Sequence, residues 1–452
     1  MKQASLNART ADVLRRLVRR RADPSVRKVL ATARPPDIAA AISHLTGAEQ
    51  RKLFSLIEDL EVAADVMTSL GEDAVLEVTR GMTDERLVAL LDYMEPDDAT
   101  DVVEVLPDEL RARVVAHLRG DAEDEVADLL AWPSDSAGGI MSPVVFKQQE
   151  SVTCGAAIEE LQARHEELDS VFYLYVVDAR ERLVGVVSLR ALLIHGPRTP
   201  LVSVMSQDII AVRPNTDQEE VARIVARYDL LAVPVVDEES RLMGIVTVDD
   251  VIDVIREEAV EDMMLLAGVA EDIDLNGRSV FRLVRDRGWW LLATAFGGII
   301  ADRSIHLFQA GVPVEAIAGL IPVVMGMGGN VGIQSTTITV RAQATGALDM
   351  TGALNFVWRE MKVAAMLGSI YGLILGGYGL MSGWPDLRIG ASVGTSVFLA
   401  ILIGGSLGAG LPVVLSRFGV DPAVATGPFV TTTVDNLGII IFFNIVRLFL
   451  GV

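Results

Sequence analysis

Asp435 has the position that most directly predicts chemistry, because it stands in the middle of an apolar run, 423–449, that could cross a membrane. A carboxylate at that depth costs about 3 kcal/mol or more, and no Lys or Arg lies within two helical turns of it. Thr431, Thr432 and Gly438 share its face by helical spacing. This small, polar face favours a watery path on which Asp435 meets a passing cation. The alternative is a protonated Asp hydrogen-bonded between helices, and Asp435 alone does not separate a metal site from a proton relay.

A second candidate for ion contact is the apolar run 316–340, which contains the sequence PVVMGMGGNVGIQ. Pro322 removes a backbone donor and can open a helix. The glycines that follow permit either unwinding or close helix approach, and taken alone they support both equally. Unwound backbone would turn carbonyl oxygens toward a cation. The candidate pore-lining residues are Gly328, Gly329 and Asn330.

An acidic stripe marks the charged helix that begins at Val248. Asp250, Asp253, Glu257 and Glu261 follow one another at spacings of three, four and four, so they share one helical face. Like charges at these spacings destabilise a helix by tenths of a kcal/mol per pair. A divalent cation held between this stripe and another acidic surface would reverse that effect, while a simple solvated face is the alternative. The candidate partner residues are Asp97, Asp101, Asp217 and Glu219.

The available ligands are carboxylates, carbonyls, amides and hydroxyls. The chain has one cysteine, Cys154, and five scattered histidines without zinc spacing. Hard oxygen ligands suit Mg²⁺, Ca²⁺ or Mn²⁺ rather than Zn²⁺ or Cu⁺. A wide site with few direct ligands suits Mg²⁺, which gives up its waters reluctantly.

Two solvents are implied by the distribution of charge. Residues 1–280 carry 53 acidic and 29 basic side chains, whereas residues 281–452 carry 8 and 10. The first part is therefore a strongly acidic, water-exposed region that repels nucleic acid and attracts cations. The second part is apolar enough to lie in lipid. The N-terminus lacks the apolar core of a secretory signal.

The spacing of apolar residues and an internal repeat predict the helices and strands that carry these residues. Helical spacing with short polar turns predicts a superhelical bundle over 1–135. The stretch 175–193 aligns with 234–252 at an offset of 59, and each reads as strand, turn, strand and helix start. Five membrane spans are expected at 288–308, 316–340, 355–381, 390–415 and 423–449. Basic residues between the spans place the N-terminus in the cytoplasm and the C-terminus outside.

The repeat resembles a tandem pair of CBS domains. Together with PVVMGMGGNVGIQ, DPAVATGPFVTTTVDNLG and the acidic helix, it makes nearly the whole chain resemble the MgtE family of bacterial magnesium channels. The resemblance implies a homodimer with Mg²⁺ bound at Asp435, and it selects Mg²⁺ over Ca²⁺. It also implies regulatory cytosolic Mg²⁺ sites at Asp97, Asp101, Asp217, Glu219, Asp250, Glu258, Glu261, Asp262 and Asp421.

The expected fold is a multidomain membrane protein. It combines a helical N domain (1–135), two α/β CBS domains (137–200 and 201–258), an acidic connecting helix (259–285) and a five-helix transmembrane bundle (286–452). The expected function is Mg²⁺ transport across the bacterial inner membrane, gated by cytosolic Mg²⁺. The alternatives are a proton- or sodium-coupled carrier and a membrane-anchored CBS sensor that transports nothing. ATP could bind the CBS pair, near Asp178, Asp237 or Thr247, but is not assigned. No nucleophile–base pair, P-loop or zinc signature indicates an enzyme.

Overall fold

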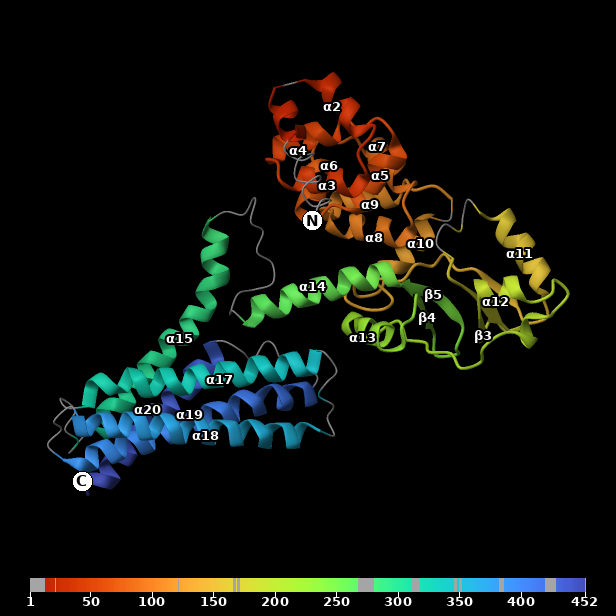
Figure 1. Cartoon of the computed structure of the whole chain (residues 1–452). Helices are drawn as coiled ribbons and strands as arrows, with labels where there is room; N and C mark the ends of the chain where they lie inside the picture. The colour runs from red at the N-terminus through yellow and green to blue at the C-terminus, as the bar shows by residue number, and fades with distance from the viewer. Residues whose placement is uncertain are drawn as a thin grey trace. The chain divides into compact units, whose positions relative to one another are not determined.

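The computed structural model describes residues 13–20, 22–120, 122–165, 168, 171–266, 280–309, 312, 317–344, 348, 352–381, 386–418 and 428–451. The chain divides into two compact units, Met1–Arg256 and Glu257–Val452. Figure 1 labels the helices and strands of both units.

The first part of the first unit is built from short helices, several of which start at a helix-initiating residue. Asp59 caps α5 by accepting a hydrogen bond from the backbone N–H of Glu61 at 3.1 Å. Pro96 begins α8, where a missing N–H costs nothing. The helices are α2 (Asp23–Leu30), α3 (Pro35–Ser43), α4 (Gly47–Phe54), α5 (Leu60–Thr68), α6 (Glu72–Thr79), α7 (Asp84–Leu91), α8 (Pro96–Val105), α9 (Asp108–Val115) and α10 (Ala122–Leu129).

These helices pack as a superhelix, as the periodicity predicts. Contacts join helices two apart in the chain, such as α3 with α5, α4 with α6, and α5 with α7. One continuous apolar core runs through the stack, with Ile38, Leu53 and Leu90 fully buried. Such stacking buries an apolar face that no single short helix could bury alone.

The rest of the first unit is the α/β pair that the repeat predicts. One sheet has strands β1 (Lys147–Gln149), β2 (Tyr173–Val177) and β3 (Leu183–Ser188), and the other has β4 (Ala232–Val236) and β5 (Leu242–Thr247). The accompanying helices are α11 (Cys154–Ala163), α12 (Leu189–Ile194), the 3₁₀ turn η1 (Leu201–Ser203), α13 (Gln218–Tyr228) and α14 (Val248–Leu266).

The offset of 59 holds in the detailed geometry of the two hairpins. In β2–β3, Tyr173 pairs with Ser188, and in β4–β5, Ala232 pairs with Thr247. Each hairpin turn carries the same i,i+4 ion pair, Asp178 with Arg182 and Asp237 with Arg241, and a residue with positive φ just before the Arg. The tandem repeat is therefore confirmed in the backbone, because the same local interactions recur at the same register.

The second unit is a helical bundle whose long helices overlap the expected spans, although the first begins at Val280 instead of residue 288 and the second at Ile321 instead of residue 316. Three of them, over Ala353–Tyr378, Leu387–Arg417 and Phe429–Leu450, are long and apolar enough to cross a membrane among the residues that the structure describes. The exact number of spans remains a prediction. The helices are α15 (Val280–Phe308), the 3₁₀ turn η2 (Ala318–Leu320), α17 (Ile321–Ala344), α18 (Ala353–Met381), α19 (Leu387–Arg417) and α20 (Pro428–Leu450).

Glycines set the spacing of α17 against α19, which run alongside each other (Figure 1). A methyl group on Gly404 would overlap the carbonyl oxygen of Gly328, and one on Gly408 would overlap that of Gly332. Unwinding near Pro322, one of the two alternatives left open by the sequence, does not occur, because α17 is one continuous helix in which Pro322 occupies the first turn. Close packing, the alternative for these glycines, is what the structure has at Gly328 and Gly332.

Candidate cation sites

Asp435 lies two turns into α20, on the side that faces α17. A methyl group placed on Gly329 would lie 3.3 Å from the Oδ1 atom of Asp435 and 3.8 Å from the methyl carbon of Thr431. Asp435 is half-buried, while its neighbour Val434 is only 1 % exposed. The missing side chain at Gly329 therefore leaves space directly in front of the carboxylate.

The surroundings of Asp435 contain no compensating charge. Among the residues that the structure describes, no Lys or Arg forms an ion pair with it, and no other charged side chain acts on it. Gly328 instead lies against Ala400 and Val434, and Asn330 is exposed. Gly329 is thus the predicted pore-lining residue that the structure brings to the carboxylate, while Gly328 serves helix packing.

A second arrangement, the acidic cluster, consists of Asp97, Asp98 and Asp250. The first two occupy the first turn of α8, and the third lies in the first turn of α14. The Oγ1 atom of Thr247 donates a hydrogen bond to Oδ2 of Asp250. One carboxylate oxygen of Asp97, Oδ1, is buried without a hydrogen-bond partner. The fold therefore brings carboxylates from two sequence-distant helices together and leaves one of them unsatisfied.

The acidic cluster is electrostatically unfavourable. Burial, followed by repulsion from Asp250, raises the pKa of Asp97 from its ordinary 3.8 to about 8. The same two causes raise the pKa of Asp98 to about 7. Burial raises the pKa of Asp250 to about 6, although the bond from Thr247 opposes this. A cation bound at the acidic cluster would offset the cost of burying these negative charges and would cancel the repulsion between them.

Asp250, one member of the predicted stripe, lies near Asp97. Two of the other predicted partners make local contacts at α13. Asp217 is exposed and caps α13 by accepting from the N–H of Glu219 at 2.8 Å. Glu219 itself pairs with Arg223 at 3.6 Å. Asp101 is exposed on α8. These positions fit a solvated face as well as a cation site.

The remaining predicted sites lie in or beyond the far part of α14. Glu258 and Glu261 are half-exposed on that helix. The side chain of Asp262 and the whole of Asp421 lie outside the described residues. Within the described part of the chain, no three His, Cys, Asp or Glu side chains come together closely enough to enclose a metal ion. A cation at the acidic cluster would thus retain water ligands, as Mg²⁺ commonly does.

Two carboxylates, the half-buried Asp98 and the buried Glu360, were not singled out from the sequence. In the sequence, Asp98 follows Asp97 in a segment that looks like a polar turn. Asp98 belongs to the acidic cluster only because α14 lies close to α8. Glu360 is 6 % exposed in α18, where it accepts a hydrogen bond from Ser335 of α17 at 3.3 Å. Its neighbours Arg359 and Lys362 make the segment read as a basic, water-facing loop. The spacing of four residues between Glu360 and the small residue Ala364, which places both on one face of the helix, is the sequence signal that could have indicated a buried glutamate.

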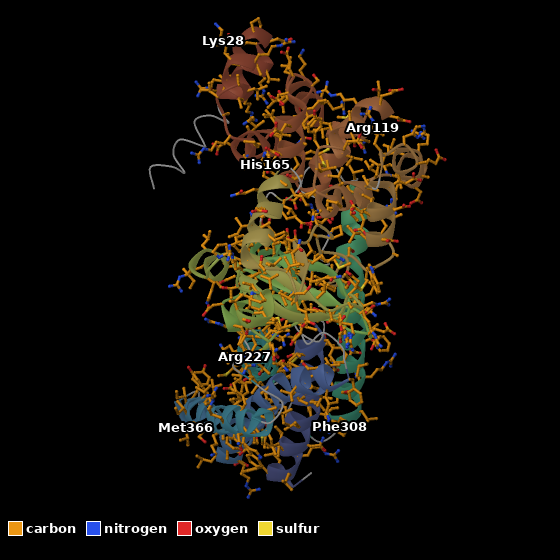
Figure 2. All side chains as sticks on the ribbon, turned by 90° about the vertical axis from the view of Figure 1, so that its right-hand side faces the viewer. Lys28, Arg119, His165, Arg227, Phe308 and Met366 are labelled. Carbon is orange, nitrogen blue, oxygen red and sulfur yellow. The ribbon has the colours of Figure 1, made fainter. Side chains whose placement is uncertain are left out.

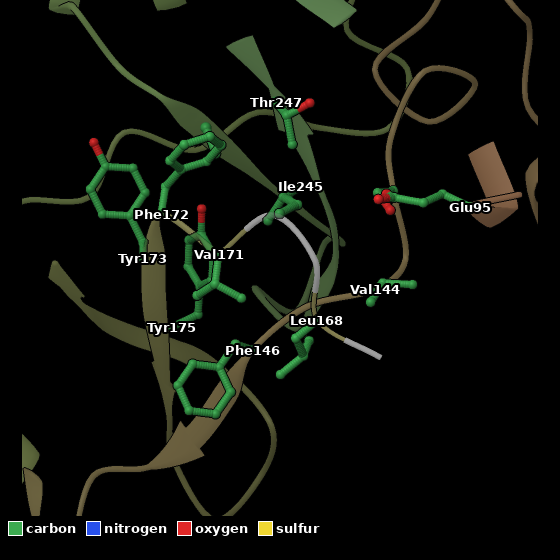
Figure 3. Close-up of a pocket in the computed structure, with 12 residues that line it drawn as sticks. Glu95, Val144, Phe146, Leu168, Val171, Phe172, Tyr173, Tyr175, Ile245 and Thr247 are labelled. Atoms are coloured by element: carbon green, nitrogen blue, oxygen red, sulfur yellow. The ribbon is translucent and has the colours of Figure 1, made fainter. Parts of the chain in front are cut away.

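A cavity of about 50 Å³ lies in the first unit, among the strands of the two repeats and next to the start of α8 (Figure 3). The hydroxyl groups of Tyr175 and Ser142 reach it and are buried without protein partners. Burial raises the pKa of Tyr175. Phe146 and Phe172 supply aromatic walls that suit a nucleobase. No basic residue is among the described residues that line it, and Glu95 would repel phosphates, so ATP is not assigned to this cavity.

The other positions considered for ATP are occupied by internal interactions. Asp178 accepts hydrogen bonds from Arg182, and these interactions lower its pKa to about 2. Asp237 accepts equivalent bonds from Arg241. Of the three residues, only Thr247 lines the cavity.

Comparison with known proteins covers both units. A family model described as a divalent cation transporter matches residues 321–445, one described as the MgtE intracellular N domain matches 33–135, and a CBS domain model matches 201–257. The magnesium transporter MgtE of Thermus thermophilus is 35% identical over 94% of this chain and 95% of its own length. Its counterpart in Bacillus subtilis is 30% identical over 94% of each chain.

A solved structure agrees with these matches. The cytosolic domain of the Mg²⁺ channel MgtE in complex with ATP superposes with a TM-score of 0.51 at 34% identity, covering 54% of this chain and 99% of that one. The matched relatives are named as transporters and correspond to this chain along nearly its whole length. The chain therefore belongs to the MgtE family and is a membrane-embedded magnesium transporter with cytosolic regulatory domains.

Proposed function

We propose that this transporter is a channel in which Mg²⁺ passes Asp435, and that cytosolic Mg²⁺ closes the channel by binding the acidic cluster. The observation that carries the proposal is the contrast between a lone carboxylate facing Gly329 and crowded carboxylates shared by α8 and α14. The first can bind a cation and release it. The second gains stability whenever a cation is present.

At Asp435 the chemistry is that of a weak oxygen site. One carboxylate without a basic partner attracts a hydrated divalent cation but offers too few ligands to strip its waters. The space left by Gly329 keeps room for those waters. A membrane potential contributes about 2.3 kcal/mol per charge per 100 mV, and about twice that for a divalent ion. Passage inward therefore needs no coupled ion.

The acidic cluster supplies the control. Without cations, repulsion among Asp97, Asp98 and Asp250 disfavours the close approach of α8 and α14. Bound Mg²⁺ reverses that repulsion and stabilises the approach, so the two arrangements differ in their affinity for the ion. A ligand that binds one arrangement more tightly shifts the population toward it. The concentration of cytosolic Mg²⁺ in this way controls whether the channel is open or closed.

The proposal has further parts that concern assembly and topology. Two copies of the chain form a homodimer in the bacterial inner membrane and bring two Asp435 residues to one pore. The N-terminus lies in the cytoplasm, and the C-terminus lies outside after five spans. The domain bounds are 1–135, 137–200, 201–258, 259–285 and 286–452. Regulatory Mg²⁺ also reaches Asp101, Asp217, Glu219, Glu258, Glu261, Asp262 and Asp421.

A nucleotide is an additional regulatory ligand to test. The related cytosolic domain binds ATP, as its solved complex is described. In this chain the cavity near Thr247 has a volume of only about 50 Å³, and Glu95 in its lining would repel phosphates, so ATP would need a different place on the CBS pair. ATP binding measured on the full chain, with Thr247→Val as a control for the cavity, separates these possibilities.

The proposed function is tested by Mg²⁺ uptake into liposomes that contain the purified protein. Wild type and Asp435→Ala are compared while Mg²⁺ on the cytoplasmic side is varied. We expect uptake by the wild type to fall as that Mg²⁺ rises, and uptake by the variant to be lost at every concentration. Full uptake by Asp435→Ala would contradict the pore, and uptake that ignores cytoplasmic Mg²⁺ would contradict the gate.

A further inference from the structure

Helix α18 presents two different faces. Glu360, Ala364, Gly368 and Gly372 follow at four-residue spacing and are buried, and the glycines lie against Phe398 and Gly394 of α19. The opposite face is exposed along its length, and Met366, 68 % exposed, lies at the outer edge of the bundle (Figure 2). In a membrane protein, an exposed apolar face of this kind meets lipid.

Two aromatic residues on α18 mark the level of the membrane. Trp358 is 53 % exposed and Tyr378 is 54 % exposed. They are separated by 20 positions in one continuous helix, which corresponds to about 30 Å at 1.5 Å per residue. This equals the usual thickness of the hydrocarbon layer, and Trp and Tyr are enriched at its two boundaries. Trp358 therefore stands at the level of the lipid headgroups.

Two cations accompany Trp358 at that level. Arg359 and Lys362 are both exposed and lie one turn apart on the same side of α18. The guanidinium carbon of Arg359 lies 4.7 Å from the centre of the Phe356 ring, which holds the side chain along the helix. Long cationic side chains at this depth extend toward the headgroups.

The nearby carboxylate neutralises these cations poorly. Glu360 is the one acidic residue of α18. Its Oε2 atom accepts from Ser335 inside the bundle, and its Oε1 atom is 3.9 Å from the Arg359 guanidinium. The Glu360 side chain is 8 % exposed while that of Arg359 is 64 % exposed. The outward face thus keeps two positive charges next to an indole.

We propose that Trp358, Arg359 and Lys362 bind the phosphate-bearing headgroup of an anionic phospholipid. The guanidinium group offers paired donors to phosphate oxygens, and the ammonium group adds a point charge. The lipid chains lie along the apolar part of the same face, past Val363, Met366 and Ile370, all exposed. This inference depends on the membrane placement of α18 and not on the pore at Asp435.

The site has a route to the transport machinery. Arg359 contacts Glu360, Glu360 binds Ser335 of α17, and α17 presents Gly329 to Asp435. A headgroup that draws Arg359 outward would break the contact between Arg359 and Glu360, and Glu360 would keep only its hydrogen bond from Ser335. Anionic lipid therefore influences how α17 is held against α18.

The test is lipid binding to the purified full chain in detergent, counted by native mass spectrometry. Phosphatidylglycerol is titrated against wild type, Arg359→Gln/Lys362→Gln and the control Arg388→Gln. Arg388 matches Arg359, because it is also 64 % exposed and lies 4.0 Å from a neighbouring carboxylate, that of Asp386. We expect the double variant to lose about 25-fold in phosphatidylglycerol affinity, from about five-fold per cation. The control should change less than two-fold.

Three results would overturn the proposal. One is unchanged phosphatidylglycerol affinity in the double variant. Another is a change in the number of protein copies per complex, which would mean that a second chain covers this face. Phosphatidylcholine serves as the neutral lipid, and retained phosphatidylcholine binding by the double variant shows that the bundle is intact. Equal losses for both lipids would also count against recognition of the anionic headgroup.

Discussion

Asp435 and the acidic cluster hold carboxylates under opposite conditions. Asp435 stands alone, half-buried in an apolar helix, with no charged neighbour in the described part of the chain. In the acidic cluster, Asp97 and Asp98 meet Asp250 across two helices, and burial, followed by repulsion from Asp250, raises their pKa values. Aspartate therefore serves two different tasks in this protein, depending on its surroundings. A lone carboxylate binds a cation briefly, whereas crowded carboxylates make a whole arrangement depend on it.

The largest effect should come from removing the lone carboxylate. Asp435→Asn keeps the size of the side chain but removes the charge that attracts Mg²⁺, so we expect transport to fall at least ten-fold (about 1.4 kcal/mol or more in the barrier). Radioactive or fluorescent uptake assays in liposomes measure this. The matched control is Asp386→Asn at the exposed start of α19, where Asn also caps a helix. Equal losses in both variants would show that the charge at 435 has no special role.

A second large effect should follow from separating α17 and α19, because their close contact positions Gly329 before Asp435. A methyl group on Gly404 overlaps the carbonyl oxygen of Gly328, whereas one on Gly410 meets open space. We expect Gly404→Ala to destabilise the membrane unit by about 1–3 kcal/mol and Gly410→Ala to leave it unchanged. Thermal unfolding in detergent provides the comparison, and identical melting temperatures would contradict the packing.

A smaller change is expected from relieving the crowding. Asp97→Asn removes one charge from the acidic cluster, so both the repulsion and the attraction for Mg²⁺ decrease. We expect transport to remain at full rate but to require several-fold more cytoplasmic Mg²⁺ for closure, as about 1 kcal/mol corresponds to five-fold. The control is Asp108→Asn, whose carboxylate is 98 % exposed in the same domain. An unchanged closing concentration would remove Asp97 from the control site.

A further effect should be seen in the pH dependence of stability without divalent cations. The pKa of Asp97 is about 8 in the folded protein and 3.8 ordinarily, so between these values the folded form binds more protons than the unfolded form. Stability of the first unit should then fall as pH rises from about 4 to 8 and level off above that. Melting temperatures of the full chain at several pH values measure this, and Asp97→Asn should flatten the curve. A rise in stability over this range would contradict the buried repulsion.

Sequence patterns predicted those features that depend on local spacing. The repeat at an offset of 59 is reproduced in strand register and in the paired turns of Asp178 and Asp237, because strand pairing and turn chemistry are local. Helix positions in the membrane unit followed from the lengths of apolar runs. Asp435 was found in the same way, since one charge in such a run stands out.

Features that depend on which elements meet were not predictable from spacing. Whether the glycines of α17 unwind or pack depends on α19, whose own Gly404 and Gly408 supply the matching surface. Asp98 belongs to the acidic cluster because α14 brings Asp250 to α8. Glu360 is held inside the bundle because Ser335 of α17 donates a hydrogen bond to it. Periodicity identifies a buried face but does not name its partner.

The most direct test of the account is whether water reaches position 435. Cys154 is the single cysteine and is buried, so Cys154→Ala provides a background in which Asp435→Cys is the only thiol. We expect a cationic, membrane-impermeant thiol reagent to modify Asp435→Cys rapidly, while the buried Val434→Cys in the same background reacts at least ten-fold more slowly. A thiol at 435 that reacts no faster than the one at 434 would contradict a cation path past this residue.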